Sequence, residues 1–126
     1  MIDQRIYSDI AQILVDELGF IEQEITLSAR VFQSADSVNM AVWRGRFMDS
    51  KNGVALSNKA SLGLLRLIVE LNKYYKAESI GKWNLMLYKL APLGKSFSID
   101  FEFNEEIESG KLTLYRYRKR FEPPKH

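Results

Sequence analysis

Apolar and polar residues alternate strictly between residues 97 and 103. The apolar positions are Phe97, Ile99, Phe101 and Phe103, and the polar positions are Ser98, Asp100 and Glu102. Successive side chains of a strand point to opposite faces of its sheet, so this pattern predicts a half-buried strand with one aromatic face. Such a face needs a cover, and the simplest cover is a helix.

Two segments show the spacing of three and four residues that is typical of amphipathic helices. The first spans residues 3–18, where Asp3 suits the helix start, Gly19 suits a left-handed end and Phe20 follows as its hydrophobic closure. The second spans residues 58–77, with Ser57 or Asn58 as its cap. Its predicted buried stripe consists of Ala60, Leu64, Leu67, Ile68, Leu71 and Tyr75. We expect this second helix to cover the aromatic strand.

Four further segments have strand patterns. Residues 25–33 and 38–48 predict an antiparallel hairpin with a turn at 34–37 and a bulge at Gly45. Residues 83–90 predict a strand that turns through 91–95 into the aromatic strand, and 112–119 predict a fifth strand. The fifth pattern is irregular, because its two leucines and two tyrosines differ in parity. A bulge near Leu114 would bring all four to the core side.

These elements predict an α+β fold with an antiparallel sheet of about five strands and helices packed on one face. The length of 126 residues and the ordinary apolar fraction of 46% fit a single globular domain. We assign this domain to residues 1–122 and a flexible tail to residues 123–126. The sequence shows neither a signal peptide nor an apolar stretch long enough for a membrane span, so we expect a cytoplasmic location.

The formal net charge of +2 is unevenly distributed. Residues 1–110 contain 12 Lys or Arg and 15 Asp or Glu, a net charge of −3. Residues 111–126 contain 6 Lys or Arg and 1 Glu, a net charge of +5. An acidic turn that holds Glu105, Glu106 and Glu108 therefore precedes a basic C-terminal segment.

The residue inventory offers little for catalysis. The chain has no cysteine, and its one histidine is the last residue, His126. Most nucleophile–base pairs and transition-metal sites need such residues, so we expect no enzyme activity, metal or cofactor. One alternative stays open: Asp100 and Glu102 would share a strand face at a separation of about 7 Å, within reach of acid–base chemistry.

Basic and aromatic residues alternate in the segment 115–121. On a strand, Arg116, Arg118 and Arg120 would share one face, and exposed tyrosines beside them could stack on bases of a nucleic acid. The structural alternative is that the tyrosines pack inside while the arginines pair with Asp100 and Glu102 on the neighbouring strand.

The segment from Trp83 to Phe103 carries a family resemblance. It reads W-x-L-x-L-Y-x-L and then G-K-x-F-x-I-D-F-x-F, after a Y-x-D-I-A helix at Tyr7, a strand pair and a leucine-rich helix. This pattern resembles the YezG-like immunity proteins, small bacterial proteins encoded beside polymorphic or contact-dependent toxins. The resemblance covers about 115 residues in the order helix, two strands, helix, three strands. It implies a protein that neutralises a toxic domain, often a nuclease, and it supplies no catalytic residue.

The expected partner is therefore the C-terminal domain of a cognate toxin, with nucleic acid as the alternative partner. The candidate partner-binding residues lie in the acidic turn and the basic segment after it: Glu105, Glu106, Glu108, Arg116, Arg118 and Arg120. Complementary charges would favour fast capture of the toxin. Reversal of the three glutamates to lysine should then weaken binding without unfolding the domain.

Overall fold

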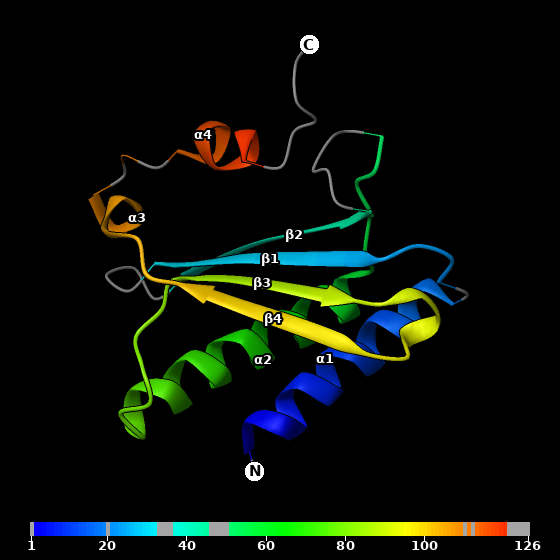
Figure 1. Ribbon diagram of the computed structural model, residues 1–126, viewed down its shortest axis with the longest axis horizontal. Coiled ribbons are helices and arrows are strands. Elements are labelled where there is room, and N and C mark those ends of the chain that lie inside the picture. Colours follow the sequence, from blue (N-terminus) through cyan, green and yellow to red (C-terminus); the bar gives the residue numbers. More distant parts are fainter. Residues whose placement is uncertain are drawn as a thin grey trace.

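The computed structural model describes residues 2–19, 21–32, 37–45, 51–109, 111 and 113–120. Along these residues helices and strands follow one another as shown in Figure 1. In chain order they are α1 (Ile2–Leu18), β1 (Ile25–Phe32), β2 (Ser37–Arg44), α2 (Asn58–Ala77), β3 (Leu85–Leu90), the 3-10 turn η1 (Pro92–Gly94), β4 (Phe97–Glu102), α3 (Glu105–Ser109) and α4 (Leu114–Lys119). The predicted α+β class is confirmed, with four strands among the described residues where about five were expected.

The four strands form one antiparallel sheet in the order β2-β1-β3-β4. In this register Leu27 of β1 lies between Val42 of β2 and Tyr88 of β3. The predicted hairpin of the first two strands is therefore confirmed. Residues 34–36 of its turn lie outside the described residues.

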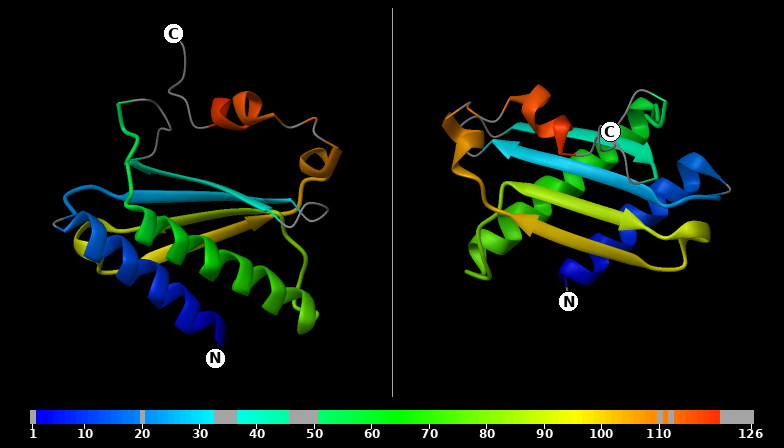
Figure 2. Two further views of the ribbon diagram at one scale, coloured as in Figure 1. Left: turned by 180° about the vertical axis from the view of Figure 1, so that it is seen from behind. Right: turned by 45° about the horizontal axis from the view of Figure 1, so that its top comes forward.

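One face of the sheet packs against α1 and α2, which cross it side by side (Figures 1 and 2). The apolar stripe of each helix is buried there, as its spacing predicts: Ile6, Ile10 and Leu14 from α1, and Leu64, Ile68 and Leu71 from α2. The alternate residues of β1 face them, from Ile25 to Val31. This layer is the main hydrophobic core.

The ends of both long helices follow from local sequence. Ser57 caps α2, where its hydroxyl accepts a hydrogen bond from the Ala60 amide at 3.1 Å. Gly19 ends α1 with a φ of 69°, and its amide donates to the Val15 carbonyl at 2.9 Å. The expected closure by Phe20 lies outside the described residues.

The aromatic face of β4 is covered by both helices, whereas α2 alone was expected. Phe101 lies 4.8 Å from the Trp83 ring and 5.2 Å from Tyr75 of α2, measured between ring centroids. Phe97 stacks on Tyr88 at 5.5 Å and lies 5.9 Å from Tyr7 of α1. Because β4 is the last strand of the sheet, Phe97 is nonetheless 39% exposed.

The predicted fifth strand is wrong, because residues 114–119 form the helix α4. Thr113 caps this helix, and its hydroxyl accepts a hydrogen bond from the Arg116 amide at 3.2 Å. A helix also resolves the conflict of parity that had suggested a bulge, because it turns Tyr117 toward the sheet without a strand register. The acidic turn before it contains a second short helix, α3.

Smaller differences concern the ends of strands. The second strand ends at Arg44, with Gly45 at a φ of 77° just after it rather than in a bulge, and residues 46–48 lie outside the description. Trp83 precedes β3 instead of opening it. Residues 121–126, which include the predicted tail, are also outside. No helix of the described chain is long and apolar enough to cross a bilayer.

Replacement of Gly94 by alanine should destabilise the fold more than replacement of Gly19. Both glycines have positive φ, where a Cβ atom costs about 1–2 kcal/mol. At Gly94 the new Cβ would also lie 3.1 Å from Cγ2 of Val15, whereas at Gly19 no atom lies within 4 Å. Urea denaturation of the two variants measures the difference. Equal losses would show that Val15 gives way without cost.

Candidate functional site

The second face of the sheet carries the short helices that hold most of the candidate partner-binding residues. In Figures 1 and 2, α4 lies over this face, on the side opposite α1 and α2, and α3 leads to it from the end of β4. Three buried side chains join the layers: Leu85 of β3, Ile107 of α3 and Tyr117 of α4. Tyr117 is only 3% exposed, and its hydroxyl forms a hydrogen bond with Ser28 of β1. We call residues 104–120 the C-terminal arm.

Arg30 of β1 is the most deeply buried charged residue beneath this arm, with 5% of its surface exposed. Its guanidinium carbon lies 5.4 Å from the Phe32 ring and 5.5 Å from the Tyr117 ring, a cation–π arrangement on two sides. Burial lowers the pKa of Arg30 from its usual value, although an arginine stays protonated at neutral pH. Sequence reasoning missed this residue. Its signal was a lone charge in a strand of otherwise apolar and small residues.

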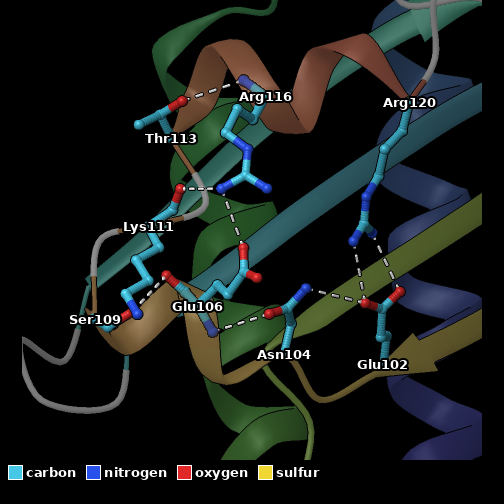
Figure 3. Close-up of polar contacts among 8 residues, drawn as sticks. All are labelled: Glu102, Asn104, Glu106, Ser109, Lys111, Thr113, Arg116 and Arg120. Atoms are coloured by element: carbon cyan, nitrogen blue, oxygen red, sulfur yellow. Dashed lines mark hydrogen bonds and ion pairs between the residues drawn. The ribbon is translucent and has the colours of Figure 1, made fainter.

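Two asparagines fix the start of the arm. Nδ2 of the buried Asn84 donates to the Asn104 carbonyl at 2.7 Å, and the Asn104 amide donates to Oδ1 of Asn84 at 2.8 Å. The side chain of Asn104 in turn accepts a hydrogen bond from the Glu106 amide at 2.9 Å and begins α3 (Figure 3). Sequence reasoning overlooked both asparagines, although an asparagine before two glutamates is typical of a helix start.

A two-bond contact ties the end of α4 to β4. The guanidinium of Arg120 donates to both carboxylate oxygens of Glu102, at 3.2 and 3.3 Å (Figure 3). This is half of the predicted structural alternative, in which the arginines pair with Asp100 and Glu102. Both partners are partly exposed, so the pair contributes about 1 kcal/mol at most.

A second ion pair joins the two short helices. Nη1 of Arg116 lies 3.2 Å from the Glu106 carboxylate and also donates to the Lys111 carbonyl at 2.7 Å (Figure 3). Arg120 follows α4 directly, one turn after Arg116, and each arginine holds an acid of a different element. The Arg120 pair therefore fastens the arm to β4, whereas the Arg116 pair joins α3 to α4 within the arm.

The candidate residues divide into two groups. Glu106, Arg116 and Arg120 form ion pairs within the chain. Glu105 and Arg118 are exposed, and neither forms an ion pair with another described side chain. The side chain of Glu108 lies outside the described part of the chain.

The prediction that three arginines share one strand face is wrong, because this segment is helical. A helix advances about 100° per residue, so Arg118 points away from the side that Arg116 and Arg120 share. Tyr117, which could have stacked on a base, is buried against the sheet. The arrangement that favoured nucleic acid is thus not formed in α4.

The two strand carboxylates also have different surroundings. Asp100 is exposed and has no ion-pair partner among the described side chains, whereas Glu102 is held by Arg120. A shallow hollow of about 220 Å³ lies beside them, lined by Leu85, Leu87, Asp100, Glu102, Tyr117 and Arg120. Over the described residues no three His, Cys, Asp or Glu side chains gather as metal ligands would.

Comparison with models of protein families and with curated proteins found no match to this chain. The resemblance to YezG-like immunity proteins therefore stays a prediction, based on the pattern from Trp83 to Phe103 and on the order of elements.

The variant Tyr117→Phe should lose less of its free energy of unfolding at alkaline pH than the wild type. Burial raises the pKa of Tyr117, so above about pH 10 a tyrosine ionises first in the unfolded chain. Its contribution to stability is full below that pH and is lost as the pH rises through the pKa of the folded state. We expect the free energy of unfolding to fall less between about pH 8.5 and about pH 10.5 in the variant than in the wild type.

Urea denaturation at both pH values measures this effect. The wild type and the variant both keep Tyr7 and Tyr88, whose pKa burial also raises, so only the difference between them reports Tyr117. Parallel pH profiles would contradict the burial of Tyr117 between α4 and the sheet.

Proposed function

We propose that this chain is a non-enzymatic immunity protein that binds and neutralises a cognate bacterial toxin domain, a nuclease by first expectation, in the cytoplasm of the producing or sibling cell. The proposal starts from the family resemblance. Its support in the fold is the order α1, β1, β2, α2, β3, β4, which agrees with the first six elements that the resemblance implies. The seventh element differs, because the arm ends in a helix instead of a strand.

The observation that carries the proposal is that the aromatic and glycine residues of the motif between Trp83 and Phe103 take part in packing on the helix side of the sheet, whereas Asp100 of the same motif is exposed. Trp83 packs on Phe101, Phe97 packs on Tyr88, and Gly94 approaches α1 with a positive φ. These residues build the framework of the domain, as the resemblance implies for a family without catalytic residues. The work of such a protein then belongs to its surface.

The contact surface that we propose is the outer side of the C-terminal arm. Glu105 and Arg118 are exposed there without ion-pair partners among the described side chains, so both charges are available to a partner. Arg120 holds the arm to β4, and the pair of Glu106 with Arg116 joins the two short helices of the arm, which gives these three residues an indirect part in recognition. A surface that carries both signs of charge favours specificity and rapid association.

The proposed function can be tested by co-expression. The probe is the C-terminal domain of the protein encoded immediately upstream of this gene. Expression of that domain alone should arrest growth, and co-expression of this chain should restore it. A neighbouring gene for an unrelated metabolic enzyme, or persistent arrest despite co-expression, would contradict the proposal.

Within such a complex, the double variant Glu105→Lys, Arg118→Glu should bind at least about 10-fold more weakly, because two exposed charges would meet like charges of the toxin. Glu106 is left unchanged, since its reversal would also break the pair with Arg116. Isothermal titration calorimetry measures the affinity.

A matched control keeps the number of charge reversals the same. Asp16→Lys and Lys59→Glu change two residues at the outer surface of α1 and α2, on the opposite side of the molecule. This control should keep the wild-type affinity. Equal affinity in both double variants would exclude the arm as the contact surface.

A further inference from the structure

The outer edge of β4 has no partner among the described residues. The sheet order is β2-β1-β3-β4, so β4 is a terminal strand with β3 on one side only. An edge of this kind presents unpaired backbone amides and carbonyls that can pair with another strand. The outer edge of the other terminal strand, β2, is partly covered by residues 52–54, because the Val54 amide donates to the Val42 carbonyl at 2.9 Å. Thus β4 is the more open of the two edges.

The register identifies which groups point outward. The Ser96 carbonyl accepts a hydrogen bond from the Ala91 amide at 2.8 Å, and the Glu102 carbonyl accepts one from the Asn84 amide at 3.1 Å. Both donors lie at the ends of β3, so these carbonyls point toward β3. In an antiparallel pair, alternate residues direct their backbone groups to the neighbouring strand. The even-numbered residues of β4 therefore face β3. The amides and carbonyls of Phe97, Ile99 and Phe101 face outward.

Space for side chains exists beside this edge, on the helix side of the sheet. A groove of about 420 Å³ lies between α1 and the start of β4, lined by Ser8, Ala11, Gln12, Val15, Lys95 and Phe97. Two of these side chains, those of Ser8 and Ala11, are small. The N-terminal half of α1 also extends beyond β4 on the helix side of the sheet (Figures 1 and 2). An added strand could therefore pack against this part of α1.

The opposite side of the edge presents one acid, Asp100, to a partner, because Glu102 is already paired with Arg120. Ser98, Asp100 and Glu102 point to the second face of the sheet, and the carboxylate of Asp100 has no ion-pair partner among the described side chains. Residues opposite Asp100 on an added strand would form a pair without direct backbone bonds, in which side chains approach most closely. A lysine or arginine is the favoured neighbour there.

We propose that β4 accepts an extended segment of a partner protein as an added strand, in which apolar residues facing the groove and α1 alternate with basic residues facing Asp100. The backbone groups of Phe97, Ile99 and Phe101 would supply affinity, and the two differing sides of the edge would supply specificity. The inference rests on the proposed function only in taking the partner to be a protein, and its test uses no toxin.

A second copy of this chain fits the edge less well. Two β4 strands could pair edge to edge so that the helices of both copies lie on the same side of the joined sheet. The Asp100 side chains of the two copies would then lie close together on the other side, where like charges repel. Each copy would also bring its own α1 into the space past the edge. A single extended segment meets neither obstacle.

Amide hydrogen exchange measured by NMR tests the proposal residue by residue. The probes are two synthetic peptides of about seven residues, one with alternating valine and lysine and one with alternating valine and glutamate. Before any addition, the amides of Ser98 and Asp100 should exchange slowly and those of Ile99 and Phe101 quickly. The lysine peptide should slow exchange at Ile99 and Phe101 at least about 10-fold, and the glutamate peptide should not.

The variant Asp100→Lys supplies the decisive comparison, because Asp100 is exposed and its replacement leaves the core intact. This variant should reverse the preference, so that the glutamate peptide protects the edge. Glu78→Lys makes the same change of charge at an exposed residue that belongs neither to β4 nor to the groove, and it should keep the wild-type preference. An unchanged preference in Asp100→Lys, or no protection of Ile99 and Phe101 by either peptide, would overturn the proposal.

Protection that grows with protein concentration in the absence of peptide would identify a second copy as the occupant and would also overturn it. Failure of the added-strand proposal can be distinguished from failure of the proposed immunity function. Neutralisation of a toxin by a protein whose edge stays unprotected would refute the added strand alone. Edge protection by the lysine peptide, with no toxin neutralised, would refute the immunity function alone.

Discussion

The structure depends on the burial of β1 on both of its faces. Every residue from Ile25 to Val31 is buried, although only alternate ones are apolar. On one face, β1 packs its apolar residues against α1 and α2. On the other, Thr26, Ser28 and Arg30 need a cover that can accept polar groups, and Tyr117 of the arm supplies a hydroxyl and a ring for part of it. The arm is therefore a second layer required by the composition of the central strand.

The two layers are held by different forces. The helix layer rests on a continuous apolar cluster that includes both long helices and three strands, and its stabilisation grows with the apolar area removed from water. The arm rests on the three buried side chains of Leu85, Ile107 and Tyr117, on the asparagine pair, and on the exposed ion pair of Arg120 with Glu102, which contributes little. All six candidate contact residues thus lie on the less firmly held part of the molecule.

The sequence predicted the helix layer well because each of its elements has one clear period. The segment 58–77 shows an apolar spacing of three and four over 20 residues, and α2 has those same bounds. The arm could not be predicted in this way, since five or six residues are too few to distinguish a helical from an alternating pattern. The parity conflict between leucines and tyrosines was a sign of a helix, which sequence reasoning took for a bulge. The pairing of Glu106 with Arg116 depends on that helix and was missed with it.

The weak attachment of the arm has a consequence for the lifetime of the protein. Local opening of a segment with few buried contacts costs less free energy than global unfolding. When the arm lifts, the peptide bonds after Arg116, Arg118 and Lys119 become available to proteases that cleave after basic residues. A bound partner that clamps the arm would shield these bonds, so a complex of this protein would outlast the free chain in the cell.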